Sequence, residues 1–238
     1  MRFEDSTAPY EKRVLLAVVL FIDWNHNMQQ ILDGIYKVDR DPGCPGFGYS
    51  YLLKRKAGNV LLCRLGKGIT IESAYDGIKT MGGIKIILVT DYHFGADVCE
   101  SIAKTFDATI YCSEIEKPKL KKRGLTQVTS LPYERQALAE DLQVIPIPGH
   151  TSGGVALLWT KGKKRYLFTG DFLYNQGKEW VAGAKSRNKI EASLESLKEL
   201  SYDYLVGCGD DECGISYLHL ATPQAKITFI DNIIAKLK

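Results

Sequence analysis

LQVIPIPGHTSGGVALLWTKGKKRYLFTGDFL, residues 142–173, is the stretch of sequence that decides the fold. It reads as paired apolar strands, and the pairs end in polar motifs. PGHTSGG (148–154) places His150 in a glycine-rich turn, and LFTGDFL (167–173) places Asp171 directly after an apolar strand. Glycine and proline mark turns of this kind. The stretch therefore predicts strands whose ends present a histidine and a carboxylate.

Two further segments have the same form, an apolar strand followed by a polar turn. The run IKIILVTD (84–91) ends in Asp91, and His93 follows two residues later. LVGCGDDECG (205–214) places Cys208 between two glycines after another strand. Loops at strand ends often carry binding and catalytic residues on a rigid scaffold. We expect these loops to converge on one rim of the fold.

The order and form of these segments resemble the metallo-β-lactamase fold superfamily. The resemblance covers roughly residues 30–213, and PGHTSGG and LFTGD match the third and fourth motifs of the family nearly letter for letter. DGIYKV (33–38) and GNVLLC (58–63) also match, and several motifs in order are more specific than one. The resemblance implies an α+β fold, a four-layer αββα sandwich. It implies one domain over residues 1–238, with residues 1–29 as an extension of uncertain role.

The first metal-binding motif of that family, THxHxDH, is altered in this chain. Thr90 matches its threonine and His93 matches its second histidine. Asp91 stands at the first histidine, and Gly95 and Ala96 stand where an aspartate and a histidine would be. The usual site holds two metal ions, typically zinc, and needs five histidines, whereas the chain has four. The resemblance therefore implies that the usual two-metal site is not built from its usual ligands.

The remaining positions imply a site for one divalent ion, Zn²⁺ first and Fe²⁺ or Mn²⁺ as alternatives, or a site without metal. Two imidazoles and one or two carboxylates suit such an ion with open positions for water. Cys208 stands at the last histidine of the family, and a thiolate is a zinc ligand. Asp171 is also the candidate catalytic residue, because it would orient a metal-bound water. The candidate ligands are Asp91, His93, His150, Asp171 and Cys208.

Each candidate ligand also has a purely structural interpretation. His93 could cap its turn, and Asp171 could accept hydrogen bonds from backbone N–H groups after its strand. Cys208 could pack as a small buried residue between its glycines. His150 could be retained for the shape of its glycine-rich turn. The sequence leaves these alternatives open.

Two functions follow from the resemblance. The first is a divergent metal-dependent hydrolase that acts on a small-molecule ester, thioester or lactone through metal-bound water. The second is a member of this fold that has lost catalysis and serves as a binding or regulatory protein. The fold alone does not choose between them, because one fold hosts many activities. The Gly95-Ala96 pair favours the second function, because it replaces an aspartate and a histidine of the family's first metal-binding motif.

Composition and charge indicate a soluble globular protein. Of its 238 residues, 45% are hydrophobic and 25% are charged, which are ordinary values. A net charge of +3 is too small to indicate nucleic acid as the main partner. The basic loop 117–123 is predicted to be a solvated flap, with binding of an anionic substrate or nucleic acid as the alternative.

The cysteines and one apolar run bear on the cellular compartment. The chain has six cysteines without a CxxC pair, which favours reduced thiols and a cytoplasmic protein. The run KRVLLAVVLFI (12–22) resembles part of a signal peptide, but no small-x-small cleavage site follows it. It is also shorter than the ~20 residues of a membrane-spanning helix. We therefore predict a buried strand there and no membrane association.

Overall fold

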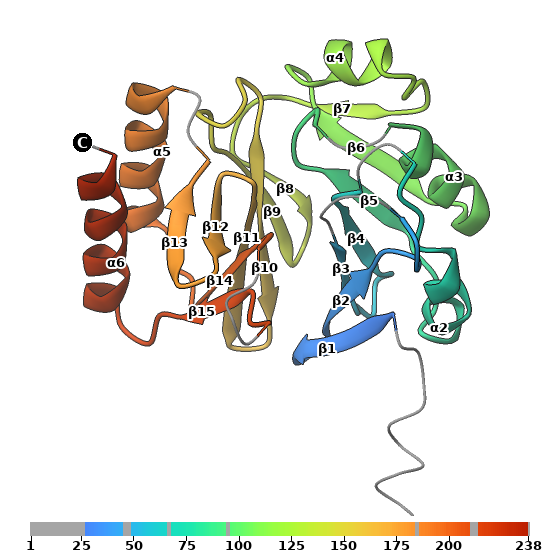
Figure 1. The fold of residues 1–238 in the computed structure, drawn as a ribbon, viewed down its shortest axis with the longest axis horizontal. Helices are drawn as coiled ribbons and strands as arrows, with labels where there is room; N and C mark the ends of the chain where they lie inside the picture. The colour runs from blue at the N-terminus through green and yellow to red at the C-terminus, as the bar shows by residue number, and fades with distance from the viewer. Residues whose placement is uncertain are drawn as a thin grey trace, which may run out of the picture.

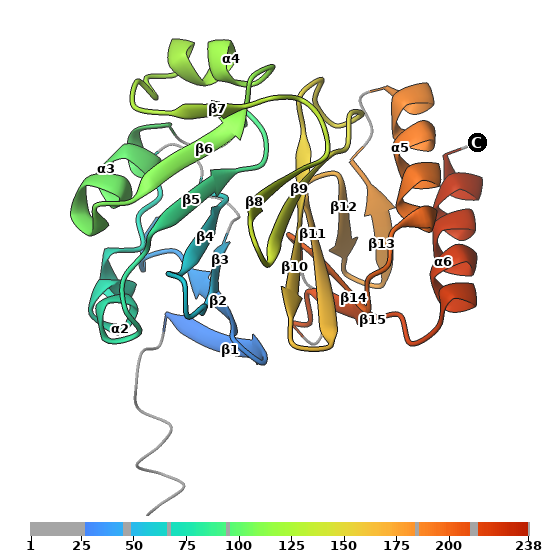
Figure 2. The same ribbon diagram turned by 180° about the vertical axis from the view of Figure 1, so that it is seen from behind.

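The computed structural model describes residues 27–44, 49–65, 68–93, 96–183, 186–209 and 214–237. Two β-sheets lie face to face, and helices cover the outer face of each sheet (Figures 1 and 2). This is the four-layer αββα sandwich of an α+β protein that the sequence predicts. The helices on one side are η1 (Glu72–Ala74), α2 (Tyr75–Thr80), α3 (Ala96–Phe106) and α4 (Lys117–Lys122), and those on the other are α5 (Arg187–Glu199) and α6 (Pro223–Lys236).

The first sheet contains seven strands in the order of the sequence. Its first four strands pair antiparallel, and each later strand runs parallel to its predecessor. Parallel neighbours need a crossover connection, and α2, α3 and α4 lie in the three crossovers. The strands are β1 (Met28–Leu32), β2 (Ile35–Asp39), β3 (Tyr49–Leu53), β4 (Val60–Cys63), β5 (Ile86–Val89), β6 (Thr109–Ser113) and β7 (Thr129–Leu131).

The second sheet contains six strands in the order β15-β14-β11-β10-β9-β8, and a separate hairpin is formed by β12 and β13. Strands β11 and β14 are parallel, and the other neighbours in this sheet are antiparallel. The strands are β8 (Gln136–Ala139), β9 (Leu142–Pro146), β10 (Val155–Lys161), β11 (Lys164–Gly170), β12 (Leu173–Gln176), β13 (Glu179–Ala182), β14 (Tyr204–Gly207) and β15 (Tyr217–His219).

The apolar strands are buried on both faces, which explains their continuous hydrophobic runs. Side chains alternate along a strand, so neighbouring residues enter different cores. In β4, Leu61 packs towards the helices and Leu62 packs towards the second sheet. In β5, Ile87 and Leu88 divide in the same way. A third core lies between the second sheet and the helices α5 and α6.

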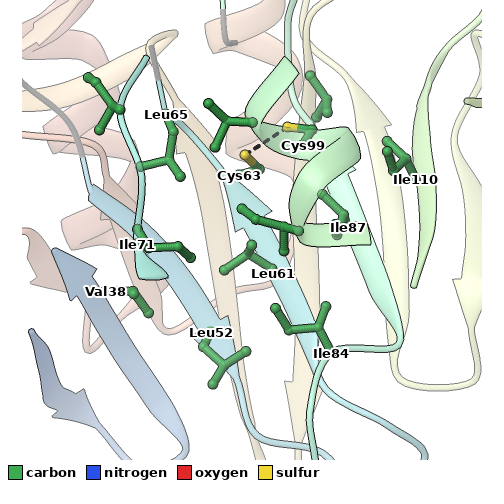
Figure 3. Packing of buried hydrophobic residues seen from close by; sticks show 14 of the residues in the cluster. Val38, Leu52, Leu61, Cys63, Leu65, Ile71, Ile84, Ile87, Cys99 and Ile110 are labelled. Carbon is green, nitrogen blue, oxygen red and sulfur yellow. Dashed lines mark hydrogen bonds between the residues drawn. The ribbon is translucent and has the colours of Figure 1, made fainter. Parts of the chain in front are cut away.

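The core between the first sheet and its helices also contains buried cysteines (Figure 3). Cys63, Cys99 and Cys112 are at most 1% exposed. They carry free thiols, and the Cys99 thiol donates a hydrogen bond to Cys63 Sγ at 2.8 Å. These thiols, from β4, α3 and β6, therefore pack as small hydrophobic groups in the core between the first sheet and its helices.

The structure corrects the prediction of a basic loop at residues 117–123. Residues 117–122 form the short helix α4, because Pro118 suits the first turn of a helix and Leu120 is fully buried. The predicted strand at 12–22 lies outside the described residues. Within the described part of the chain, no helix has both the length and the apolar character needed to cross a membrane.

An ion pair links the turn between β3 and β4 to the turn between β8 and β9. Arg55 Nε donates to Asp141 Oδ2 at 2.9 Å, and Arg55 Nη2 donates to Asp141 Oδ1. Trp159 Nε1 also donates to Asp141 Oδ2, at 2.9 Å. The Arg55 side chain is only 3% exposed, and its hydrogen bond holds the pKa of Asp141 below the usual range. The pair therefore ties the two sheets together.

Replacing Asp141 with alanine is expected to lower the free energy of unfolding by about 2–3 kcal/mol, because it leaves the buried Arg55 without its counterion. The carboxylate stabilises the fold above the ordinary aspartate pKa of about 3.9, and this contribution is lost as the pH falls through the lower pKa of the folded state. Urea denaturation of both proteins from pH 7 to pH 3 measures the difference, which should shrink at the acid end.

The exposed pair of Asp76 and Lys79 provides the control for that measurement. Asp76→Ala should change the free energy of unfolding by less than ~1 kcal/mol, because exposed ion pairs contribute little. Equal effects of the two substitutions would show that Asp141 does not link the sheets.

Candidate metal centre

The predicted site residues converge on one rim of the sandwich because the strands that precede them end there. Strands β4 and β5 are parallel neighbours in one sheet, and β11 and β14 are parallel neighbours in the other, so each pair presents its carboxyl ends together. The turn between β9 and β10 reaches the same rim. The side chains that meet are Arg64 after β4, Asp91 and His93 after β5, His150 in the turn, Asp171 after β11 and Cys208 after β14.

Four of these side chains form a group with the composition of a metal site. Asp91, His93, His150 and Asp171 each offer one ligand atom, and these atoms all lie within 4.8 Å of one another. His93 Nδ1 lies 3.0 Å from Asp91 Oδ1 and 3.0 Å from His150 Nε2. His150 Nε2 lies 3.8 Å from Asp171 Oδ2.

These distances fit one tetrahedral ion. Zinc binds nitrogen and oxygen at about 2.0–2.2 Å, which places tetrahedral ligand atoms about 3.3–3.6 Å from one another. The distances of 3.0 and 3.8 Å between neighbouring donor atoms bracket that spacing. Two imidazoles and two carboxylates are also donors that divalent zinc, iron and manganese accept. The chemistry and the spacing of the group therefore fit one divalent ion.

His150 is oriented by the backbone around it. Its Nδ1 lies 3.0 Å from the carbonyl oxygen of Gly183, so its Nε2 is directed at the group of four. A hydrogen bond of this kind fixes the tautomer and the ring of a metal-binding histidine. A Cβ atom at Gly183 would lie 2.0 Å from Asp171 O and 2.8 Å from His150 Nδ1. Only glycine fits at this position, which the sequence motifs do not predict.

The PGHTSGG turn is held by a buried carboxylate from the segment between β6 and α4. Glu116 is fully buried, and its Oε1 accepts a hydrogen bond from the Gly153 N–H at 2.7 Å. Ser113 Oγ donates to Gly153 O at 2.7 Å. A Cβ atom at Gly153 would lie 2.7 Å from Ile115 Cβ, so this glycine permits the close approach. The contacts connect the turn that carries His150 to the end of β6.

The turn after β5 positions the first two candidate ligands. Asp91 is 4% exposed, and its Oδ1 accepts a hydrogen bond from the His93 backbone N–H at 2.9 Å. The Tyr92 ring packs on the His93 ring, with centroids 4.2 Å apart. Lys119 Nζ lies 4.3 Å from the Tyr92 ring centroid, and Arg123 Nη1 donates to Tyr92 O. Cations of α4 and of the residue after it therefore border the site. Gly95, which stands in place of the family's aspartate, lies outside the described residues.

Cys208 lies on the other side of Asp171 from the two histidines. Its Sγ donates a hydrogen bond to Asp171 Oδ1 at 2.8 Å, and it is not a member of the group of four. Burial raises the pKa of the Cys208 thiol well above its usual range. The thiol is therefore protonated at neutral pH and acts as a donor to the carboxylate.

Arg64 is the site residue that the sequence interpretation missed. Its Nε lies 2.8 Å and its Nη2 2.7 Å from Asp171 Oδ1, and its Nη1 donates to Cys208 O at 2.7 Å. Its place in the sequence is the one feature that points to a role in the site, because Arg64 directly follows the apolar strand β4 just as Asp171 directly follows β11. It lies outside every matched motif of the family, so the motifs do not predict its role.

Comparison with known sequences finds similarity to the family that the motifs resemble. Residues 100–209 match the model of the Metallo-beta-lactamase superfamily. The uncharacterized protein YmaE of Bacillus subtilis (strain 168) is 26% identical over 195 residues, which cover 75% of this chain and 69% of that protein. Hydroxyacylglutathione hydrolase of Halorhodospira halophila (strain DSM 244 / SL1) is 33% identical over 86 residues, which cover 35% of this chain and 32% of that enzyme.

Solved structures share the fold over nearly the whole chain. A B3 metallo-β-lactamase with an active-site glutamic acid matches with a TM-score of 0.59 and 18% identity, covering 92% of this chain and 95% of that one. A metallo-β-lactamase from Pontibacter korlensis matches with a TM-score of 0.63 and 16% identity, covering 86% and 98%. The fold, the family match and the group of candidate ligands agree. The chain therefore has the fold of the metallo-β-lactamases, and its residues 100–209 match the model of that superfamily.

Proposed function

We propose that the chain is a hydrolase that depends on one divalent metal ion, in the first place Zn²⁺, and cleaves a small-molecule ester, thioester or lactone. The observation that carries this proposal is the group of two imidazoles and two carboxylates with ligand atoms within 4.8 Å of one another. The relative named hydroxyacylglutathione hydrolase and the β-lactamases among the structural neighbours support a hydrolytic activity.

The four side chains would hold the ion and leave one side open to substrate. Asp91 has a side chain only 5% exposed, whereas the His93 side chain is 26% exposed and that of Asp171 is 18% exposed. A bound divalent ion would polarise the substrate carbonyl and lower the pKa of a bound water towards neutrality. Asp171 Oδ2 faces His150 and would orient the attacking water and accept its proton.

The cations beside the site favour a substrate with a negatively charged group. Lys119 Nζ and the Arg123 guanidinium lie 4.3 and 5.9 Å from the centroid of the Tyr92 ring, which itself packs on His93. A carboxylate or phosphate on the substrate could pair with these cations while the scissile carbonyl reaches the group of four. We do not expect nucleic acid as the partner, since the net charge is only +3.

The second candidate is a protein that has lost catalysis and binds a small molecule at this rim. Two contacts of one atom favour it, because His93 Nδ1 lies at hydrogen-bond distance from both Asp91 Oδ1 and His150 Nε2. These polar groups therefore satisfy one another without an ion. In this case the rim would bind its ligand through hydrogen bonds, and removal of metal would leave ligand binding unchanged.

Metal reconstitution separates the two candidates. The protein is stripped with a chelator, reloaded with one equivalent of Zn²⁺, Mn²⁺ or Fe²⁺, and assayed on an aryl ester, a thioester and a lactone. Hydrolysis that appears only after loading, above that of free metal in buffer, supports the hydrolase. Failure to retain metal after reconstitution, or equal rates with and without metal, contradicts it.

A further inference from the structure

The two oxygens of the Asp171 carboxylate face different surroundings. Oδ2 faces His150 Nε2 at 3.8 Å, on the side of the proposed metal ion. Oδ1 is contacted by Arg64 Nε, Arg64 Nη2 and Cys208 Sγ, at 2.8, 2.7 and 2.8 Å. One carboxylate thus joins the candidate metal group to a cation that belongs to the chain.

Arg64 is held in place by more than the carboxylate. Its Nη1 donates to the backbone carbonyl of Cys208 at 2.7 Å, so the guanidinium spans the ends of β11 and β14 from the end of β4. Its side chain is 22% exposed. A guanidinium remains charged at all physiological pH values, and its planar fork binds carboxylates with fixed geometry. The positive charge at this position is therefore permanent and well placed.

We propose that Arg64 takes the place of a second metal ion and limits the site to one. This inference rests on the proposed single-metal function and specifies how the chain achieves it. A second ion would need Asp171 Oδ1 and Cys208 Sγ as ligands, and both lie against the guanidinium and its partners. Repulsion between the two cations then keeps a second ion away. Arg64 is also a positioning residue, since it fixes Oδ1 and leaves Oδ2 to the metal group.

Substitution of Arg64 should open the second position. Arg64 and Cys208 line one pocket together with Thr90 and Phe168, so a shorter side chain leaves space for an ion and water. Arg64→His removes the permanent charge and supplies an imidazole beside the Cys208 thiol and Oδ1 of Asp171. Asp, Cys and His are all ligands that zinc and cobalt accept. Arg64→Lys is the matched control, because it retains the charge.

Cobalt titration of the metal-free proteins tests the proposal, with circular dichroism as the check on folding. We expect wild type and Arg64→Lys to bind one equivalent of Co²⁺ without a sulfur-to-cobalt charge-transfer band. Arg64→His should bind two equivalents and show that band. Adding Cys208→Ser to Arg64→His should remove the band and the second equivalent.

The outcomes distinguish this inference from the proposed function. Two equivalents in the wild type, or one equivalent and no band in Arg64→His, would overturn the role of Arg64 and leave the metal-dependent hydrolase standing. No cobalt in the wild type but a thiolate-bound ion in Arg64→His would support the role of Arg64 and overturn the hydrolase. If Arg64→His does not fold, Arg64→Ala replaces it and must show the band at higher cobalt concentration, and its absence overturns the proposal.

Discussion

Replacing His150 with alanine is expected to abolish hydrolysis and to weaken metal binding at least ~100-fold, since loss of even an outer partner of a ligand costs 10–100-fold. The His150 ring lies between the other candidate ligands, because its Nε2 is 3.0 Å from His93 Nδ1 and 3.8 Å from Asp171 Oδ2. Without it the remaining donors no longer surround an ion. Equilibrium dialysis with zinc analysis measures the affinity, and the reconstitution assay measures the rate.

His219 provides the control for this substitution. Its exposed side chain stacks on the Tyr204 ring, with centroids 4.6 Å apart, and it belongs to strand β15. His219→Ala should leave metal binding and hydrolysis unchanged. Retention of wild-type zinc affinity by His150→Ala would show that the group of four is not the metal site.

The second large effect is expected for Asp171→Asn, which preserves the shape of the side chain and removes its charge. An asparagine amide has only one acceptor oxygen. If that oxygen faces Arg64 and Cys208, the amide nitrogen faces the group of four. If the amide is rotated by half a turn, its nitrogen instead faces the guanidinium of Arg64. We expect kcat to fall by about 10²–10⁴-fold, the usual contribution of a general acid or base, together with a loss of metal affinity.

Asp203→Asn is the matched control, because Asp203 also places a carboxylate at a strand end. This carboxylate accepts a hydrogen bond from the Arg165 backbone N–H at 2.7 Å and does not belong to the group of four. It should leave the rate of the reconstituted protein unchanged. A wild-type rate in Asp171→Asn would remove this carboxylate from the proposed mechanism, whatever its effect on stability.

The fold could be predicted largely from the sequence because its strands and turns carry local signals. The runs at 84–91 and 142–173 combine apolar segments with polar turns, and their order matches one family. Ile190, Leu194 and Leu197 have helical spacing and are fully buried in α5. The helix at 117–122 is not predicted from the sequence because it has a single buried side chain, Leu120, among half-buried and exposed lysines.

The candidate site could be predicted only in part. The matched motifs contain Asp91, His93, His150 and Asp171, and the structure brings them together. Arg64 and Gly183 have no such motif, and their roles depend on contacts between distant segments. Arg64 meets Asp171 across 107 positions of the sequence, and Gly183 is required by the space around His150. The contact of Arg64 arises only when the two sheets pack together, and that of Gly183 only when the end of the β12–β13 hairpin meets the turn between β9 and β10.

The number of metal ions bound by the wild-type protein tests the central claim most directly. Metal-free protein is titrated with Zn²⁺ by isothermal calorimetry, and the retained metal is measured by elemental analysis after gel filtration. The group of four and the Arg64 cation predict one equivalent of Zn²⁺ per chain, lost in His150→Ala. No retained zinc, or two equivalents per chain, would contradict the account.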